Sequence, residues 1–384
     1  MGSAELATAF WLSALLAGWA WVGYPLSLVL RRRWKPAPEV RKAPFTPRVS
    51  VLIVAHNEGH RIAGKIRNCL SLDYPRDRLE VVVASDGSTD DTEDVVEGFR
   101  SEGVRLVRLP GPRGKAAAIE AAVPVSTGEV LLLCDARQEL ESGALRALVD
   151  NLADPSVGAA SGELCIRSGA SAAAEGVGFY WRYEKWVRRL ESQVGSTVGV
   201  TGAIYVVRRE LLPRLDPRTI LDDVAVPMGV VRAGRRVVFE SSARAFDEPV
   251  EEAGHEFRRK VRTLAGNYQL VALHPGLLDP RRNPLFFSFL SHKLARLLVP
   301  WCLVMMLGTS LALALGGSPV FALLAGAQAI FGLLAVVGGA LHVVRRRVAF
   351  LSVPYAVALL HLAAAFALVE FVRGRQTAAW RSAP

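Results

Sequence analysis

Four apolar stretches, each long enough to cross the hydrocarbon core of a membrane, constrain the fold of this chain most strongly. They lie at residues 6–30, 297–315, 320–344 and 348–372 of the 384-residue sequence. A membrane-spanning helix needs roughly 20 apolar residues, so the pattern predicts a membrane protein. The first stretch is too long for the apolar part of a signal peptide, and no small-residue cleavage site follows it. We therefore expect a retained anchor.

Two arginine triplets predict the orientation of these stretches, because lysine and arginine concentrate on the cytosolic side of a membrane. Arg31-Arg32-Arg33 ends the first stretch, and residues 345–347 separate the third from the fourth. The chain between the first and second stretches therefore lies in the cytosol. Four spans then put the C-terminal tail outside, against this rule, because the tail carries Arg373, Arg375 and Arg381. We expect the fourth stretch to be either re-entrant or an exception to the rule.

The stretches divide the chain into three parts. Residues 1–36 form an anchor with a basic stop, residues 37–283 form a cytosolic domain, and residues 284–384 form an interfacial helix followed by about three membrane helices. The aromatic segment 284–293 predicts the interfacial helix. The alternative is that this segment simply begins the second span.

Composition indicates which partners the chain has. It is 51% hydrophobic and still 21% charged, with a net charge of +10. No basic run alternates with aromatic residues in the polar part, so we predict that the positive charge faces membrane lipids and anionic phosphates, not nucleic acid. The four cysteines have neither disulfide nor zinc-site spacing, which fits a reducing cytosol.

Short β-branched runs alternate with amphipathic segments in the polar part. We expect strands at 49–55, 79–84, 104–109 and 130–134, with helices after Asn57 and at 91–99 and 115–122. This order predicts a doubly wound α/β domain with a mostly parallel sheet. Ligands bind beyond the carboxyl ends of the strands in such sheets.

A polar motif follows each of these four strands. The motifs are His56-Asn57-Glu58, Ser85-Asp86-Gly87-Ser88, Arg113-Gly114-Lys115 and Asp135. The Asp86 carboxylate can accept a hydrogen bond from a nucleobase or ribose, and Gly87 permits a close turn; an ordinary Asp-Gly turn with a helix cap is the alternative. Lys115 opens a helix and so offers a cation and free N–H groups to phosphate, unless it is an ordinary surface lysine.

Five motifs in order resemble those of the family 2 glycosyltransferases of GT-A type. They are Ala55-His56-Asn57-Glu58, Ser85-Asp86-Gly87-Ser88-Thr89-Asp90, Arg113-Gly114-Lys115-Ala116, Asp135-Ala136-Arg137 and Leu221-Asp222-Asp223. The resemblance covers about residues 48–266 and is strongest to the membrane-anchored, polysaccharide-synthase-like branch. It implies a GT-A domain that transfers a sugar from a nucleotide-sugar, usually a UDP-sugar, to a hydroxyl with inversion. The acceptor would be a polysaccharide or a lipid-linked molecule in cell-envelope or exopolysaccharide synthesis at the plasma membrane.

The resemblance also implies roles for individual residues. Glu58 and Asp86 would contact the nucleoside, and Lys115 would lie near the donor diphosphate or sugar. The donor-binding set is Ala55, Asn57, Glu58, Asp86, Gly87, Lys115, Asp135, Arg259 and Arg262. Thr201 and Gly202 would shape the acceptor site.

The adjacent carboxylates Asp222 and Asp223 match the family position of the general base. Asp223 would take the proton of the acceptor hydroxyl, and Asp222 would support it. Neighbouring carboxylates raise each other's pKa, which suits a base that works near neutral pH. A helix N-terminus rich in acids is the alternative interpretation.

Asp135 is the predicted ligand of Mg²⁺ or Mn²⁺, because hard divalent cations prefer carboxylate oxygens and would stabilise the leaving diphosphate. The family pattern has a second acid where this chain has Arg137. Either Asp247 or His255 supplies a further ligand, or Arg137 takes over part of the cationic role.

Residues 258–263 depart from the family pattern as well. Processive synthases carry Gln-x-x-Arg-Trp here, whereas this chain keeps only Arg262, with Arg259 and Thr263 in place of the Gln and Trp. The missing Trp would normally floor the acceptor subsite, so a polymer acceptor is in doubt. The alternatives are a single transfer to a polyprenyl phosphate or other lipid, and a non-catalytic scaffold that binds nucleotide.

Overall fold

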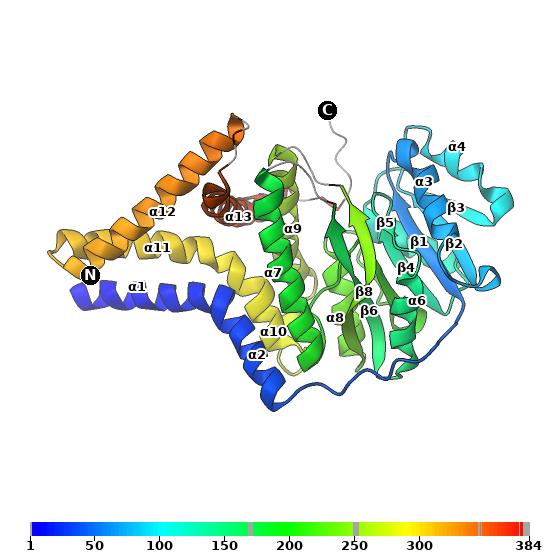
Figure 1. The fold of residues 1–384 in the computed structure, drawn as a ribbon, viewed down its shortest axis with the longest axis horizontal. Helices are drawn as coiled ribbons and strands as arrows, with labels where there is room; N and C mark the ends of the chain where they lie inside the picture. Colours follow the sequence, from blue (N-terminus) through cyan, green and yellow to red (C-terminus); the bar gives the residue numbers. More distant parts are fainter. Residues whose placement is uncertain are drawn as a thin grey trace.

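The computed structural model describes residues 2–167, 172–248, 253–344, 346, 348–375 and 377–378. An α/β domain and a group of long apolar helices lie next to each other along the longest axis of the molecule (Figure 1). Two long helices, α7 (Ala172–Val194) and α9 (Ala253–Leu273), stand between them. The chain therefore has the domain and membrane parts that its sequence predicts.

The domain is built on an eight-stranded sheet in the order β3-β2-β1-β4-β7-β6-β8-β5. The strands are β1 (Val49–Ala55), β2 (Leu79–Ser85), β3 (Val104–Arg108), β4 (Val130–Asp135), β5 (Glu139–Leu140), β6 (Val157–Ile166), β7 (Tyr205–Arg208) and β8 (Arg236–Asp247). Strands β1 to β4 pair in parallel, as predicted. Strand β7 runs antiparallel to both β4 and β6 and so reverses the sheet direction.

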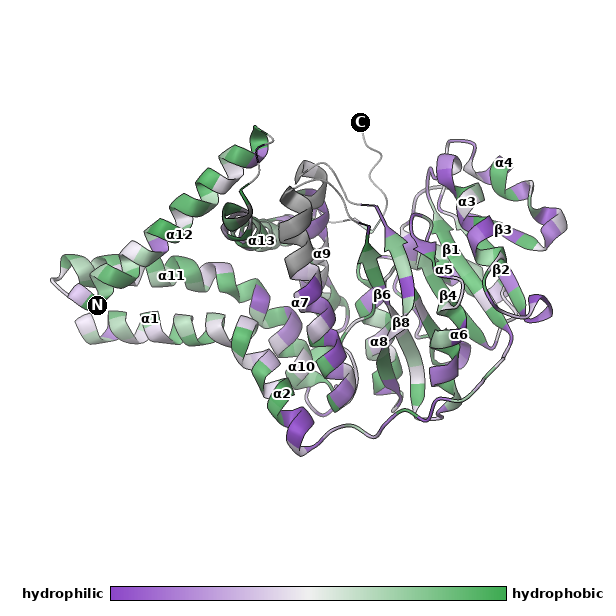
Figure 2. Ribbon diagram, viewed as in Figure 1, coloured by the Kyte–Doolittle hydropathy of each residue, from purple (hydrophilic) through white to green (hydrophobic). Residues whose placement is uncertain are grey.

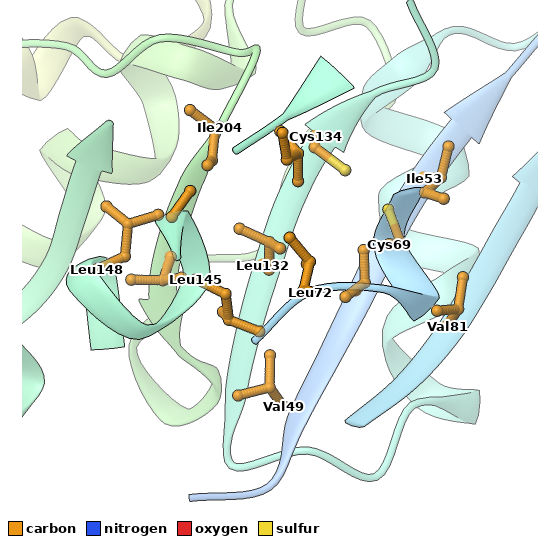
Figure 3. Packing of buried hydrophobic residues seen from close by; sticks show 14 of the residues in the cluster. Val49, Ile53, Cys69, Leu72, Val81, Leu132, Cys134, Leu145, Leu148 and Ile204 are labelled. Carbon is orange, nitrogen blue, oxygen red and sulfur yellow. The ribbon is translucent and has the colours of Figure 1, made fainter. Parts of the chain in front are cut away.

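Helices cover both faces of this sheet. They are α3 (Gly59–Leu70), α4 (Thr92–Glu97), α5 (Lys115–Ala122), α6 (Ala144–Val149) and α8 (Asp222–Arg232). Ile53 and Leu132 from the strands pack with Leu145 and Leu148 of α6 in one buried cluster (Figure 3). The helices α5 and α8 cover the opposite face. Because both faces are buried, β1 and β4 consist almost wholly of apolar residues.

Four helices are long and apolar enough to span a membrane. They are Ser3–Trp34, Phe286–Leu315, α12 (Pro319–Val343) and the helix of residues 350–372, which forms most of α13 (Ala349–Val372). The first comprises α1 (Ser3–Gly18), a π-helical turn (Trp19–Gly23) and α2 (Tyr24–Trp34). Hydrophobic residues dominate the surfaces of α1, α11 (Ala295–Leu315) and α12 (Figure 2). Lipid would cover these surfaces.

The prediction of a separate interfacial helix at 284–293 is wrong. The helix α10 (Phe286–Phe289) and a π-helical turn (Leu290–Leu294) continue directly into α11, so the segment begins the second span. Its inner face is buried because Phe289 and His292 pack inside the protein.

The last long helix, α13, has an unexpected direction. It is seen nearly end-on where α1 and α11 lie in the plane of the picture, so it runs across them (Figure 1). It packs against α7 and α9 of the domain side. Further along the chain, Ala378 contacts the α/β domain at Gly114. Ala378 therefore lies against the α/β domain.

Buried charged groups join the membrane helices to α7. Arg296 pairs with Glu184, while His292 lies 3.1 Å from Glu184 and 2.7 Å from Glu191. The Tyr24 hydroxyl of α2 donates to Glu191 over 2.7 Å. Burial alone would raise the pKa of both glutamates. Arg296 and His292 nevertheless hold the pKa of Glu184 below its usual value, and His292 does the same for Glu191. Both are therefore carboxylates that depend on their partners.

Candidate active site

Two loops at the carboxyl ends of β1 and β2 form one hydrogen-bonded unit. Asn57 has a positive φ of 57°, and its side-chain oxygen accepts the N–H of Thr89 at 2.8 Å. The backbone N–H of Glu58 donates to Thr92 over 2.8 Å. Asn57 therefore joins the two loops. Asparagine tolerates this left-handed conformation better than most residues.

Asp86 holds a third loop against this unit. Its two carboxylate oxygens accept the backbone N–H groups of Arg113 and Gly114, at 2.8 and 2.7 Å. A Cβ atom on Gly87, which has a φ of +66°, would lie 2.4 Å from the backbone of Gly111. Asp86 is fully buried, so the structure gives it a role in shaping the donor loops. Its direct contact with a nucleoside stays a prediction.

Glu58 lies at the edge of this unit. It is half-buried, and its carboxylate is 2.9 Å from Arg61. Burial raises the pKa of Glu58, and Arg61 offsets part of that rise. Ala55, at the end of β1, is buried in the core beneath the loop and presents only its backbone to a ligand.

Lys115 connects the donor loops to the predicted catalytic acids. Its Nζ atom lies 2.7 Å from Asp135 at the end of β4 and 3.4 Å from Asp222 at the start of α8. Burial acts to lower the pKa of Lys115, but the two carboxylates outweigh it and raise the value well above normal. The lysine is therefore a permanent cation between two acids. Lys115 thus brings together Asp135 and Asp222, which are 87 positions apart in the sequence.

The two adjacent acids of α8 have different surroundings. Asp222 is buried, and burial raises its pKa to about 6 although Lys115 opposes the shift. Asp223 is more accessible. Burial raises its pKa too, while the charges of Lys293 and Lys115 lower it in part. One acid thus faces the donor loops, and the other lies nearer the membrane helices.

Gly202, one of the two predicted acceptor-site residues, borders this cluster. A Cβ atom on Gly202 would lie 3.2 Å from the Nζ atom of Lys115 and 3.7 Å from Asp135. Thr201 is buried and its N–H donates to Ser161 over 3.0 Å. Gly202 therefore leaves open space beside the charged groups.

Asp247, one candidate for the further metal ligand, already has protein partners at one carboxylate oxygen. Its carboxylate pairs with Arg137 and accepts a hydrogen bond from Gln138 at 2.9 Å, and it is buried. The side chain of His255 is outside the described residues. In the described ranges, no three His, Cys, Asp or Glu side chains form a group that could hold a metal. Asp135 alone, with a side chain 39% exposed, fits a cation whose remaining ligands come from substrate phosphates and water.

The C-terminal tail reaches the predicted phosphate-binding residues. Arg262 on α9 donates to the carbonyl oxygen of Ala378 at 3.0 Å. A Cβ atom on Gly114 would lie 2.6 Å from that carbonyl group. Arg259 lies on the same helix and is exposed. The sequence did not mark either the tail or Lys293 as part of the site. Lys293 ends the segment 284–293, which was predicted only to contact the membrane, and the tail follows the last apolar stretch.

Comparison with known proteins supports the assignment of the domain. Residues 50–215 match the family model for glycosyl transferase family 2. A mannosyltransferase from Pyrobaculum calidifontis, solved with GDP-mannose and Mn²⁺, has the same fold with a TM-score of 0.72 and 24% identity. That match covers 96% of this chain and 99% of the other. The fold and site together define a glycosyltransferase domain of GT-A type.

Curated relatives agree with this class. A probable glycosyltransferase of Bacillus subtilis is 28% identical over 244 residues, which cover 59% of this chain and 56% of the relative. A beta-monoglucosyldiacylglycerol synthase of Synechocystis is 27% identical over 282 residues, or 68% of this chain and 57% of the relative. The chain thus spans a little over half the length of these relatives. Its residues 50–215 are similar to the family 2 glycosyltransferases.

Proposed function

We propose that the chain is an inverting glycosyltransferase that moves a sugar from a nucleotide-sugar of the UDP class to an acceptor hydroxyl at a membrane surface. The observation that carries this proposal is the charged cluster at the carboxyl edge of the sheet. There Lys115 lies between Asp135 and Asp222, and Asp223 follows directly. Donor-binding and proton-accepting groups are side by side in this cluster.

The donor diphosphate would bind where α5 begins. The backbone N–H groups at a helix N-terminus and the Lys115 ammonium favour an anion there. Asp86 fixes the loop 111–114 that leads into this helix end. Arg262 would add a cation from α9, as the sequence predicts, and Arg259 is exposed on the same helix.

Asp135 would hold Mg²⁺ or Mn²⁺ together with the donor phosphates. When bound, the metal would neutralise charge that develops on the leaving diphosphate. The Pyrobaculum mannosyltransferase was solved with Mn²⁺, which supports this choice. Arg137 does not complete the site, because its guanidinium pairs with Asp247.

The acceptor hydroxyl would attack the anomeric carbon from the face opposite the diphosphate. A new C–O bond forms, the bond to the diphosphate breaks with its electron pair, and Asp223 accepts the hydroxyl proton. Asp223 suits this role because it is the more accessible acid and its pKa is raised. The neighbouring Asp222 keeps its proton until about pH 6, which limits the charge repulsion between Asp222 and Asp223.

The site would face the cytosol, next to the membrane helices. The arginine triplet 31–33 follows the first span on the side of the domain, in agreement with the positive-inside rule. Relatives include a poly-beta-1,6-N-acetyl-D-glucosamine synthase of Staphylococcus epidermidis, 23% identical over 229 residues, and the glycolipid synthase of Synechocystis. Both support synthesis of an envelope polysaccharide or glycolipid.

A donor screen tests the proposal. Purified protein in lipid nanodiscs receives radiolabelled nucleotide-sugars together with a membrane lipid extract, and product and hydrolysed sugar are counted. Asp223→Asn should reduce transfer by about 10²- to 10⁴-fold and keep UDP binding. The exposed Asp94→Asn on α4 is the matched control. Full transfer by Asp223→Asn would refute the assignment of the base, and no turnover of any donor would favour a nucleotide-binding scaffold.

A further inference from the structure

An apolar cavity of about 330 Å³ lies outside the charged cluster. Helix α13 provides aliphatic walls, among them Ala356 and Leu360, and the opposite wall contains Trp21, Tyr180 and Tyr183. This volume is at the lower end of the roughly 300–1,000 Å³ of small-molecule sites. A sugar ring would lose most of its hydrogen bonds here, which is costly. The cavity suits a segment of hydrocarbon chain.

Its position fits a ligand that enters from lipid. The cavity lies between the bend of the first membrane helix, at Trp21, and α13, which runs across the membrane helices (Figure 1). Helices α7 and α9 close it on the side of the α/β domain. A chain from the bilayer can therefore reach it without crossing water.

One cation lines the cavity, and a second, which is not among the lining residues, stacks on two of its aromatic rings. Lys260 lines the cavity, with its Nζ atom 4.8 Å from the ring centre of Tyr180. The Arg296 guanidinium stacks 4.8 Å from Trp21 and 5.3 Å from Tyr183.

Arg296 is 9% exposed, and its Nη1 pairs with Glu184. Its Nε and Nη2 groups, and Nε1 of Trp21, are buried without a hydrogen-bond partner in the part of the chain that the structure describes. A buried donor without a hydrogen-bond partner destabilises the protein. These donors indicate an oxygen-rich, negatively charged ligand group.

The same helices lead from the cavity to the proposed base. On α9, Lys260 is two residues from Arg262. Arg262 donates a hydrogen bond to Ala378, which contacts the donor loop at Gly114. On α7, Glu184 binds Arg296, and one turn later Arg188 is among the cations that act on Asp223. A molecule anchored in the cavity can thus extend along α7 and α9 towards the reaction centre.

We propose that this cavity binds the hydrocarbon chain of the acceptor, an amphiphile whose phosphate separates the chain from the hydroxyl that receives the sugar. The chain fills the apolar part, and the phosphate lies by Lys260 and the free donors of Arg296 and Trp21. The hydroxyl then reaches Asp223. The acceptor role rests on the proposed function, whereas lipid binding does not.

The first test measures binding alone. Native mass spectrometry of the full chain in detergent follows the uptake of dodecyl phosphate and of dodecanol. Ala356→Trp, which fills the cavity, should weaken binding of dodecyl phosphate at least tenfold. Leu362→Trp on the exposed face of the same helix is the matched control and should bind normally. Lys260→Gln should reduce the preference for dodecyl phosphate over dodecanol. Equal binding by Ala356→Trp and Leu362→Trp would overturn the site, and no preference for the phosphate in the wild type would overturn the headgroup assignment.

The second test concerns the acceptor role. With the nucleotide-sugar found in the screen and a membrane lipid extract, Ala356→Trp should raise the acceptor KM at least tenfold and leave donor hydrolysis by water unchanged. An unchanged acceptor KM would overturn the acceptor role. If no donor is turned over even by the wild type but Ala356→Trp still loses dodecyl phosphate, the proposed function fails while the lipid site stands.

Discussion

Asp222 should destabilise the folded chain at neutral pH, and its neutral analogue should stabilise it. The pKa of this buried carboxyl rises from 3.8 to about 6. A raised acid pKa means that the folded state keeps the proton longer than the unfolded state. Stability is therefore full below about pH 4, falls as the pH rises to about 6, and remains reduced above that value.

The magnitude follows from the shift. About two pKa units at 1.36 kcal/mol each give roughly 3 kcal/mol. Asp222→Asn has nearly the same shape and no charge to desolvate, so it should recover up to about 3 kcal/mol at pH 8 and almost nothing at pH 4. For a domain of this size that corresponds to roughly 6–12 °C in Tm.

Thermal unfolding in nanodiscs, followed by tryptophan fluorescence at several pH values, measures this effect. The wild type should lose thermal stability between about pH 4 and pH 6 relative to Asp222→Asn, and the two curves should converge in acid. Asp216→Asn is a control for a carboxyl whose pKa is lowered to about 2 by Arg218. If Asp222→Asn has a lower Tm than the wild type at pH 8, the pair with Lys115 stabilises more than burial costs, and the reasoning is wrong.

Three other changes test separate parts of the structure. Gly87→Ala forces a Cβ to 2.4 Å from the backbone of Gly111 at a positive φ, so we expect a loss of about 1–3 kcal/mol in unfolding free energy, whereas Gly143→Ala, which meets nothing, should change little. Asp135→Ala should abolish the Mn²⁺ dependence of donor binding in calorimetry; identical binding in excess chelator by the wild type would remove the metal from the mechanism. Deleting residues 375–384 removes Ala378 from Gly114 and Arg262 and should tighten UDP binding severalfold, and weaker binding would show that the tail helps to form the site.

The sequence was sufficient for the first half of the sheet. Strands β1 to β4 end within one residue of their predicted limits. Apolar runs that are buried almost throughout mark β1, β2 and β4. The second half was not predicted. Strand β7 has only four residues, Tyr205–Arg208, and its direction depends on pairing with β4 and β6, which lie far away in sequence.

The site shows the same division. Local motifs marked Lys115, Asp135 and the acids of α8, which the fold brings together. The sequence could not reveal that Asp247 pairs with Arg137, since 110 positions separate the two residues. Nor does composition give the direction of an apolar helix, so α13 read as a span although it runs across α1 and α11.

The contact of Ala378 with the donor loops has a practical consequence. An affinity tag or fluorescent protein joined after Pro384 would be tethered within six residues of Gly114, because residues 379–384 are all that separate the junction from that contact. Kinetic constants from such a fusion would partly describe the tag. Labels inserted at the exposed turn Gly316-Gly317 between α11 and α12 would leave the rim of the catalytic domain as the chain itself forms it.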